Sequence, residues 1–181
     1  NVGANTVTLT VLDVNGNSDS KTAIVRIEDQ IKPTLVTQNI TVQLDALGKA
    51  TITESQIDNG SNDNCAIDKI TLDKTDFDCT NVGANTVTLT VLDVNGNSDS
   101  KTATVTIEDQ IKPTLVTQNI TVQLDALGKA TITESQIDNG SIDNCAIDKI
   151  TLDKTDFDCS NIGNNTVTLT VLDVNGNSDS K

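Results

Sequence analysis

The sequence predicts an all-β protein made of tandem immunoglobulin-like β-sandwich domains, with about seven strands in each 80-residue period. First, a segment typical of a β-hairpin, residues 5–18, recurs at 85–98 and 165–178. Second, the sequence has two Phe and no Trp, Tyr or Met, so the core must come from Val, Ile and Leu, which suit strands. A period of 80 residues is too long for one solenoid coil and is close to the smallest independent domain.

The repeated hairpin is the clearest predicted element. In residues 87–91 aliphatic side chains alternate with threonine, and a period of two places the aliphatic residues on one face of a strand. Asn95-Gly96 follows, a dipeptide that tolerates positive φ at both central positions of a type I′ turn. Residues 103–107 alternate in the same way, so we expect a half-buried hairpin.

The repeat also predicts the domain boundaries. A Glu-Asp-Gln-Ile-Lys-Pro-Thr segment occurs at 28–34 and 108–114, and its proline cannot donate to a sheet, so we expect the junctions there. Residues 1–29 are then the C-terminal part of one domain, 30–109 a complete domain, and 110–181 a domain that lacks its last strand. Residues 1–101 and 81–181 differ at six positions when aligned.

The complete domain shows alternating aliphatic residues separated by turn signals. In order, we expect strands at 35–37, 40–44 and 50–52, a polar loop at 53–64 with room for a helical turn over 54–57, strands at 70–72 and around Phe77, and the two hairpin strands.

Composition argues against several functions. The net charge of −14 is spread evenly, so the chain should repel nucleic acid and anionic membranes and attract divalent cations. The sequence has no His, the commonest general base and zinc ligand, and no nucleophile–base pair is evident. No apolar run approaches the ~18 residues that span a bilayer. We therefore expect no enzyme, no nucleic-acid partner and no transmembrane segment within this sequence.

Four cysteines occur at the same two places in each period: Cys65, Cys79, Cys145 and Cys159. We expect one disulfide within each domain, Cys65 to Cys79 and Cys145 to Cys159, because the chain can fold back at 74–76 between the first two. Closing such a loop contributes ~3 kcal/mol to the stability of the folded domain. Disulfides would also indicate an oxidising, extracellular compartment. Metal ligation and redox catalysis are the alternatives, but C-x-x-C spacing and a partner His are missing.

Acidic residues near the junctions form a candidate calcium site. Glu108 and Asp109 end one domain, and the loop 138–144 belongs to the next; if both lie at the same pole, their carboxylates meet. Calcium takes six to eight oxygen ligands and would stiffen the linker. The alternative is solvated Asx-turn residues. Over both junctions the candidate ligands are Glu28, Asp29, Asp58, Asp63, Glu108, Asp109, Asp138 and Asp143.

A second oxygen-rich segment, residues 93–99, resembles a calcium loop in its alternating Asp and Asn. An EF-hand needs Gly at its sixth position, whereas Gly96 is the fourth residue here. We therefore interpret this segment as a hairpin turn.

Taken together, Asp-Asn-Cys at 63–65, the hairpin from 81, the Asp-Val-Asn-Gly-Asn-Ser turn at 93–98 and the junction at 28–34 resemble HYR-like immunoglobulin-type repeats. More narrowly, they resemble the repeats of giant SprB-type surface adhesins of gliding Bacteroidetes. The resemblance implies tandem domains in long extracellular filaments, exported by the type IX system and carried by the gliding machinery. HYR repeats more often place the second Cys near the last strand, whereas Cys79 precedes the hairpin.

We therefore expect a structural stalk of a secreted adhesin on the surface of a Gram-negative bacterium. Its partners would be neighbouring repeats, the gliding machinery of the cell envelope and, through other regions, an external surface or polysaccharide. The alternative is a module that itself binds extracellular polysaccharide, although such sites usually present aromatic side chains.

Overall fold

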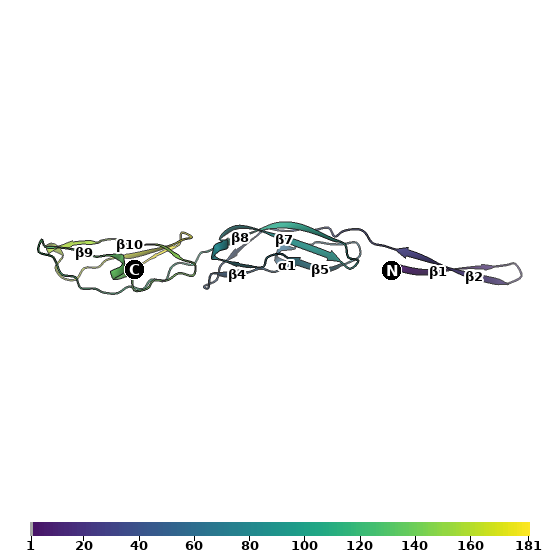
Figure 1. Ribbon diagram of the computed structural model, residues 1–181, viewed down its shortest axis with the longest axis horizontal. Helices are drawn as coiled ribbons and strands as arrows, with labels where there is room; N and C mark the ends of the chain where they lie inside the picture. The colour runs from purple at the N-terminus through teal and green to yellow at the C-terminus, as the bar shows by residue number, and fades with distance from the viewer. Residues whose placement is uncertain (1) are drawn as a thin grey trace. The chain divides into compact units, whose positions relative to one another are not determined.

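The computed structural model describes residues 2–181 (Figure 1). Most of its elements are strands in several small sheets, so the predicted all-β class is confirmed. No helix among these residues is long and apolar enough to cross a membrane. Contacts divide the chain into two compact units: the first holds the chain up to Gln38 with Thr53–Lys74 and Val87–Ala103, and the second holds Asn39–Ile52, Thr75–Thr86 and Thr104–Lys181.

The first hairpin pairs β1 (Gly3–Leu12) antiparallel with β2 (Ser18–Ile27). No other described strand pairs with these two. In this chain several aliphatic residues of the hairpin are exposed, among them Leu9 at 70% and Val11 at 62%.

The middle copy of the repeat forms a four-stranded sheet in the order β3-β8-β7-β5, with β3 parallel to β8 and β5 antiparallel to β7. A second sheet pairs β4 with β6. The bounds are β3 (Ile40–Gln43), β4 (Lys49–Thr51), α1 (Glu54–Ile57), β5 (Ile67–Leu72), β6 (Asp76–Asp78), the 3-10 turn η1 (Cys79–Asn81), β7 (Gly83–Asp93) and β8 (Ser98–Glu108).

In the middle copy, the predicted inner face of the hairpin formed by β7 and β8 is confirmed. Val87, Leu89 and Val91 of β7 are fully buried, and the threonines between them are partly exposed. In β8, residues 103–107 follow the same alternation. The period-two pattern thus orients both strands correctly.

The third copy forms a sheet in the order β10-β12-β13 and a pair β9-β11. Its buried core contains Ile132, Ile137, Leu169 and Val171. The counterpart of β3 is not a strand, because β3 pairs with β8 residues whose equivalents would follow β13. The bounds are β9 (Lys129–Thr131), α2 (Glu134–Ile137), β10 (Ile147–Leu152), β11 (Asp156–Asp158), η2 (Cys159–Asn161), β12 (Leu169–Asp173) and β13 (Ser178–Ser180).

Two local predictions need correction. The edge strand expected at 35–37 is replaced by isolated bridges at Thr34 and Thr37. Between them, Val36 N–H donates to the Ser61 hydroxyl at 3.0 Å rather than to a strand. The helical turn over 54–57, by contrast, is present as α1.

The type I′ turn at Asn95-Gly96 is also wrong. Gly96 has φ +94°, but no described non-glycine residue has a positive φ. Gly96 N–H donates to Asp93 O at 3.3 Å, which closes a turn with a left-handed glycine at its end. The Asp93 carboxylate accepts the Asn95 and Asn97 N–H groups, both at 2.8 Å, and holds the loop in this form.

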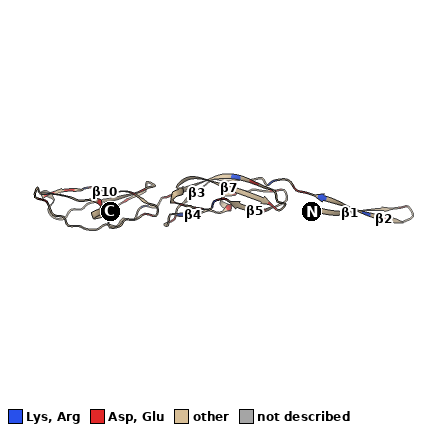
Figure 2. Cartoon of the chain, in the orientation of Figure 1, with Lys and Arg blue, Asp and Glu red and all other residues tan. Residues whose placement is uncertain are grey.

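Figure 2 shows short blue and red stretches, which mark basic and acidic residues, in several separate parts of the ribbon. The buried polar residues include Asp109, Ser141 and Asp173, which lie where one copy of the repeat meets the next.

Candidate inter-repeat junction

The candidate site is the point where β8 ends and the next copy of the repeat begins. We call it the 109 junction: Asp109, the loops 138–145 and 173–177, and Cys79 with the turn 45–49 beside it. All of these residues belong to the second compact unit.

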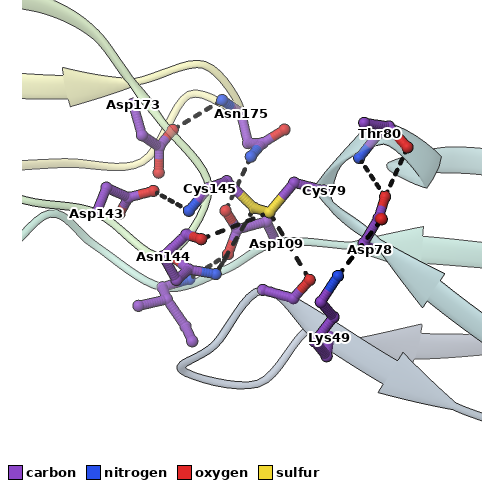
Figure 3. Close-up of a disulfide and its surroundings, with 12 residues drawn as sticks. Lys49, Asp78, Cys79, Thr80, Asp109, Asp143, Asn144, Cys145, Asp173 and Asn175 are labelled. Carbon is purple, nitrogen blue, oxygen red and sulfur yellow. Dashed lines mark hydrogen bonds and ion pairs between the residues drawn. A yellow bond between two sulfur atoms is a disulfide. The ribbon is translucent and has the colours of Figure 1, made fainter.

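A disulfide crosses the 109 junction (Figure 3). It joins Cys79 of one copy to Cys145 of the next, across 66 residues of sequence. The predicted pairs within each domain, Cys65 to Cys79 and Cys145 to Cys159, are therefore wrong. Cys65 and Cys159 are free and exposed.

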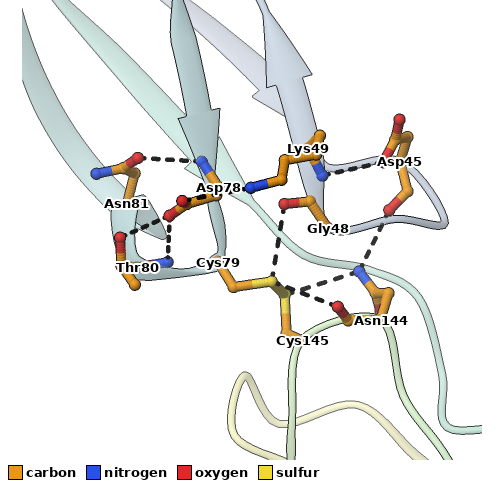
Figure 4. Close-up of polar contacts among 9 residues, drawn as sticks. All are labelled: Asp45, Gly48, Lys49, Asp78, Cys79, Thr80, Asn81, Asn144 and Cys145. Atoms are coloured by element: carbon orange, nitrogen blue, oxygen red, sulfur yellow. Dashed lines mark hydrogen bonds and ion pairs between the residues drawn. A yellow bond between two sulfur atoms is a disulfide. The ribbon is translucent and has the colours of Figure 1, made fainter.

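The bonded sulfur lies against the backbone of both copies (Figure 4). Cys79 Sγ is 3.8 Å from Gly48 O and 3.6 Å from Asn144 O. A Cβ at Gly48 would lie only 2.6 Å from this sulfur and 2.8 Å from Asn144 O. Only a glycine leaves room there, and its φ of +68° also favours glycine.

The 3-10 turn η1 holds Cys79 in place. Its first residue follows Asp78, whose carboxylate accepts the Thr80 N–H at 2.9 Å and the Thr80 hydroxyl at 2.6 Å. The hydroxyl bond is the main cause that lowers the pKa of Asp78. Lys49 Nζ lies 3.5 Å from the same carboxylate. The cysteine therefore projects from an anchored turn rather than a loose loop.

Three asparagines hold Asp109 from the next copy of the repeat. The side-chain amides of Asn144 and Asn175 donate to its two carboxylate oxygens at 3.2 and 2.8 Å, and Asn177 Nδ2 donates to its carbonyl at 3.1 Å. Asn144 Nδ2 also lies 3.4 Å from Asp45 O. The junction is thus closed by amide hydrogen bonds as well as by the disulfide.

Three carboxylates meet at this junction. Asp109, Asp143 and Asp173 each have an oxygen within 4.8 Å of the others, and Asp109 and Asp173 are buried, with 7% and 1% exposed. Asp143 Oδ1 and Asn144 Oδ1 are buried without a hydrogen-bond partner in the described part of the chain. Unpartnered oxygens beside buried carboxylates are chemically suited to a hard cation.

The structure brings only some of the predicted metal ligands together. Asp109 and Asp143 meet at one junction, and Asp29 and Asp63 meet at the preceding one with Cys65. The other four predicted ligands have partners elsewhere. Glu28 pairs with Arg26, Glu108 accepts from Gln43 and Gln110, and Asp58 and Asp138 cap their own loops through Ser61 and Ser141.

The preceding junction, which we call the 29 junction, contains Asp29, Asn64, Cys65 and Asn95. Its hydrogen bonds match those of the 109 junction, but Cys65 forms no disulfide there. Asn64 and Asn95 donate to Asp29 at 3.2 and 2.9 Å. Cys65 interacts with the same carboxylate, and this is the main cause that lowers the pKa of Asp29 and raises the pKa of Cys65. A thiol with a raised pKa is a poor nucleophile, which argues against a catalytic role.

Asp173 and its neighbours Asn175 and Asn177 were not predicted as part of the site. The available signal was the oxygen-rich segment 93–99, which repeats at 173–179. The sequence indicates a turn there, and the turn is present. The same residues also face the junction, because the loop lies beside Asp109.

Comparisons with known proteins give little further information. No family model and no curated protein matches the chain. Among solved structures, the chain is similar to "Protocadherin Gamma B7 extracellular cadherin domains 1-4", with 14% identity and a TM-score of 0.37. The alignment covers 99% of this chain and 56% of that one, so the chain spans little more than half of that structure. A likeness this distant assigns neither a family nor a function.

Proposed function

We propose that the chain is a non-enzymatic, load-bearing stalk segment of a long secreted cell-surface adhesin. The observation that carries this proposal is the Cys79–Cys145 bond, which joins successive copies of the repeat. A covalent bond at this place transmits tension past the junction without relying on weak contacts. Disulfides persist in oxidising compartments, and this supports an extracellular location.

The finer assignment is to the SprB-type adhesins of gliding bacteria. Its support is the order of the junction, cysteine and hairpin motifs at a period of 80 residues. In this assignment the type IX system exports the protein to the surface of a Gram-negative cell. The gliding machinery then moves it, while other regions of the polypeptide grip the substratum.

Replacing the repeat region in the producing bacterium tests this assignment. Deletion should reduce both surface attachment and colony spreading, because the adhesive region loses reach. An unrelated β-sandwich array of equal length should restore both. Normal attachment and spreading after deletion would contradict the stalk role.

The alternative function is direct binding of polysaccharide. The aromatic residues speak against it: Phe77 is 2% exposed, and Lys154 Nζ lies 4.6 Å from the centre of the Phe157 ring. Phe157 also packs against the buried core of the third copy, so neither ring is a freely exposed platform for a sugar. A glycan array probed with the 181-residue chain separates the two functions, since a stalk segment should give no signal above buffer.

As a second part of the proposal, the junction binds calcium. Asp109, Asp143 and Asp173 would hold the ion, with Asn144 Oδ1 as a neutral oxygen. What supports this is the donor set, which is oxygen only, and the two buried oxygens that have no partner. A bound ion would screen the mutual repulsion of the carboxylates and stiffen the junction.

Thermal unfolding tests the calcium proposal. The melting temperature should be higher in millimolar calcium than in chelator, and magnesium should give a smaller shift because it dehydrates reluctantly. Asp143→Asn should abolish most of the calcium shift, whereas Asp179→Asn on the exposed strand β13 should retain it. Equal melting temperatures with calcium and with chelator would refute calcium binding.

A further inference from the structure

The peptide that carries one half of the disulfide also carries two candidate ligands of the junction. Asp143, Asn144 and Cys145 are consecutive, and Cys145 is bonded to Cys79 of the preceding copy. Asp143 Oδ1 and Asn144 Oδ1 are buried without a hydrogen-bond partner in the described part of the chain. The bond that fixes Cys145 therefore also restricts the positions of these two oxygens.

The backbone of Cys145 orients the Asp143 carboxylate. Its N–H group donates to Asp143 Oδ2 at 2.9 Å, which leaves Oδ1 as the oxygen without a partner. An oxygen of Asp143 lies within 4.8 Å of one oxygen of Asp109 and one of Asp173. A displacement of Cys145 would therefore move one carboxylate of this group away from the other two.

Asn144 is held by contacts on both sides of the junction (Figures 3 and 4). Its carbonyl oxygen lies 3.6 Å from Cys79 Sγ. Its side-chain Nδ2 donates to Asp109 Oδ1 at 3.2 Å and to Asp45 O at 3.4 Å. Because the nitrogen faces these acceptors, Oδ1 is left as a neutral oxygen for an ion. The disulfide thus supports the position from which Asn144 offers this oxygen.

The disulfide and an ion at the 109 junction would cross the same boundary between copies of the repeat. The disulfide joins Cys79 of one copy to Cys145 of the next. An ion would join Asp109, the last residue of the first of these copies, to Asp143 and Asp173 of the next. Two cross-links at one boundary share an entropic cost, because the first already restricts the motion that the second must restrict.

We propose that calcium at the 109 junction and the Cys79–Cys145 bond stabilise each other, so that oxidation raises the calcium affinity and calcium opposes reduction. The proposal rests on the calcium part of the proposed function. In the oxidised chain the ligands are already held together when the ion arrives. In the reduced chain the loop 138–145 must be ordered on binding, so the affinity is lower. Linkage requires the two effects to be the same factor.

The reductant is a small thiol such as glutathione. One glutathione thiolate attacks a sulfur of the Cys79–Cys145 bond, forms a mixed disulfide and releases the other cysteine as a thiolate. A second glutathione thiolate attacks the glutathione sulfur of the mixed disulfide and releases the remaining cysteine. Two glutathione thiols are oxidised to one disulfide, which balances the two protein thiols formed. Calcium exchanges no electrons; it shifts this equilibrium by binding the oxidised chain more tightly.

Equilibration with glutathione buffers tests the proposal. The starting protein is Cys65→Ser/Cys159→Ser, which keeps the Cys79–Cys145 bond and removes the two exposed thiols that could exchange with it. Thiol alkylation and mass spectrometry measure the reduced fraction, in calcium and in chelator at the same ionic strength. The ratio of squared reduced glutathione to oxidised glutathione at half reduction should be higher in calcium, by roughly 5- to 150-fold, the usual coupling between two sites.

Calcium titration measures the same coupling in the opposite direction. By isothermal titration calorimetry, the oxidised chain should bind calcium at this junction more tightly than the reduced chain, by the factor found with glutathione. The signal of this junction is the part of the titration that Asp143→Asn removes. Cys79→Ser/Cys145→Ser gives a second chain without the bond, and circular dichroism checks that it is folded. The glutathione-reduced chain supplies the comparison if that variant does not fold.

A pair of aspartate variants separates binding at the junction from a general effect of calcium on an acidic chain. Asp143→Asn removes one proposed ligand and should give the same glutathione ratio in calcium and in chelator. Asp179→Asn on the exposed strand β13 removes the same charge and should retain the calcium effect. An equal calcium effect in the two variants would contradict the proposal.

The measurements distinguish failure of the coupling from failure of calcium binding. If the oxidised chain melts at a higher temperature in calcium but the glutathione ratio is unchanged, calcium binding stands and the coupling is overturned. If calcium does not change the melting temperature of the oxidised chain, both are overturned and the stalk role remains. Easier reduction in calcium would also overturn the coupling, because its sign would be opposite.

Discussion

A single carboxylate at the tip of the last hairpin organises the loop around it. Asp173 Oδ1 accepts the N–H groups of Asn175 and Asn177, and Oδ2 accepts the Asn177 side-chain amide, all at 2.8 Å. Only 1% of Asp173 is exposed, so these donors, rather than water, supply the hydrogen bonds to its carboxylate. Because Asn175 and Asn177 also reach Asp109, the loop that Asp173 shapes is part of the junction.

Replacing this carboxylate should therefore be costly. Asp173→Asn removes one of two acceptor oxygens and turns an amide N–H group toward the Asn177 donor. We expect the free energy of unfolding to fall by about 1–3 kcal/mol, measured by urea denaturation. The control Asp179→Asn lies on an exposed strand and should change it by less than about 0.5 kcal/mol. Equal losses would contradict a specific role for Asp173.

Hydrogen-bonded aspartates also predict how stability depends on pH. The Thr80 hydroxyl lowers the pKa of Asp78, and the Ser141 hydroxyl, 2.5 Å from Asp138, lowers the pKa of that carboxyl. A group whose folded pKa lies below its unfolded value stabilises the fold above the unfolded value, about 3.9 for Asp. This stabilisation is lost as the pH falls through the folded pKa. The aspartates with a lowered pKa are Asp13, Asp29, Asp73, Asp78, Asp93, Asp138 and Asp158.

We accordingly expect the urea midpoint to be nearly constant between about pH 5 and 8 and to decrease below about pH 4. The sequence has no His to titrate within the upper range. Thr80→Val with Ser160→Ala should reduce the acid-dependent part, because each change removes the hydroxyl donor to an aspartate. A midpoint that rises on acidification would contradict the assigned sign.

At the scale of elements, two strands with the same sequence lie in different surroundings. The strand β1 and residues 83–92 of β7 have the same ten residues, but Leu9 is 70% exposed and Leu89 is fully buried. Strand sequence alone therefore does not fix burial. The difference is that the middle copy provides other buried residues, such as Ile52, Ile57 and Phe77, to its core, whereas the described residues place only β2 beside β1.

This identity allows a matched pair of substitutions. Leu89→Ala should lower the free energy of unfolding by about 2–5 kcal/mol, because it leaves a cavity in the core. Leu9→Ala changes the same residue in the same local sequence and should cost less than about 0.5 kcal/mol. Urea denaturation of the two variants side by side checks this, and similar losses would mean that the first hairpin is covered in solution.

Local chemistry explains which elements could be predicted. Alternation over 87–91 was sufficient to orient β7, since it depends only on the period of a strand. The turn at Asn95-Gly96 was predicted with the wrong type, because the Asp93 side chain, rather than the dipeptide alone, selects the backbone conformation. The hydrogen bonds of the Asp93 side chain are visible in the structure, whereas the sequence of this turn is compatible with several turn types.

The disulfide could not be paired from the sequence for a different reason. Each cysteine recurs with the repeat, so Cys79 has a candidate partner on either side, and loop-closure entropy favours the nearer Cys65. The deciding contact is long-range: Asn144 of the next copy lies against the turn that contains Asp45 and brings Cys145 to Cys79. No local pattern contains that information.

At the scale of the whole molecule, the bond changes how the chain responds to unfolding and to force. It closes a loop across 66 residues, which contributes about 4 kcal/mol through the lost entropy of the unfolded chain. Tension applied to the two ends of the chain passes from Cys79 to Cys145 directly. The residues between them, including β7 and β8, are then shielded from the load.

Single-molecule stretching should detect this shielding as a shorter full extension of the oxidised chain. With the bond intact, full extension should be shorter by about 230 Å, which is the extended length of the 66 residues in the loop. A reducing agent, or Cys79→Ser with Cys145→Ser, should restore the missing length because the load then passes through every residue. Cys65→Ser with Cys159→Ser is the matched control and should keep the shorter extension, since both residues lie outside the bond. Equal extensions for the oxidised and reduced chain would show that the junction carries its load without the disulfide.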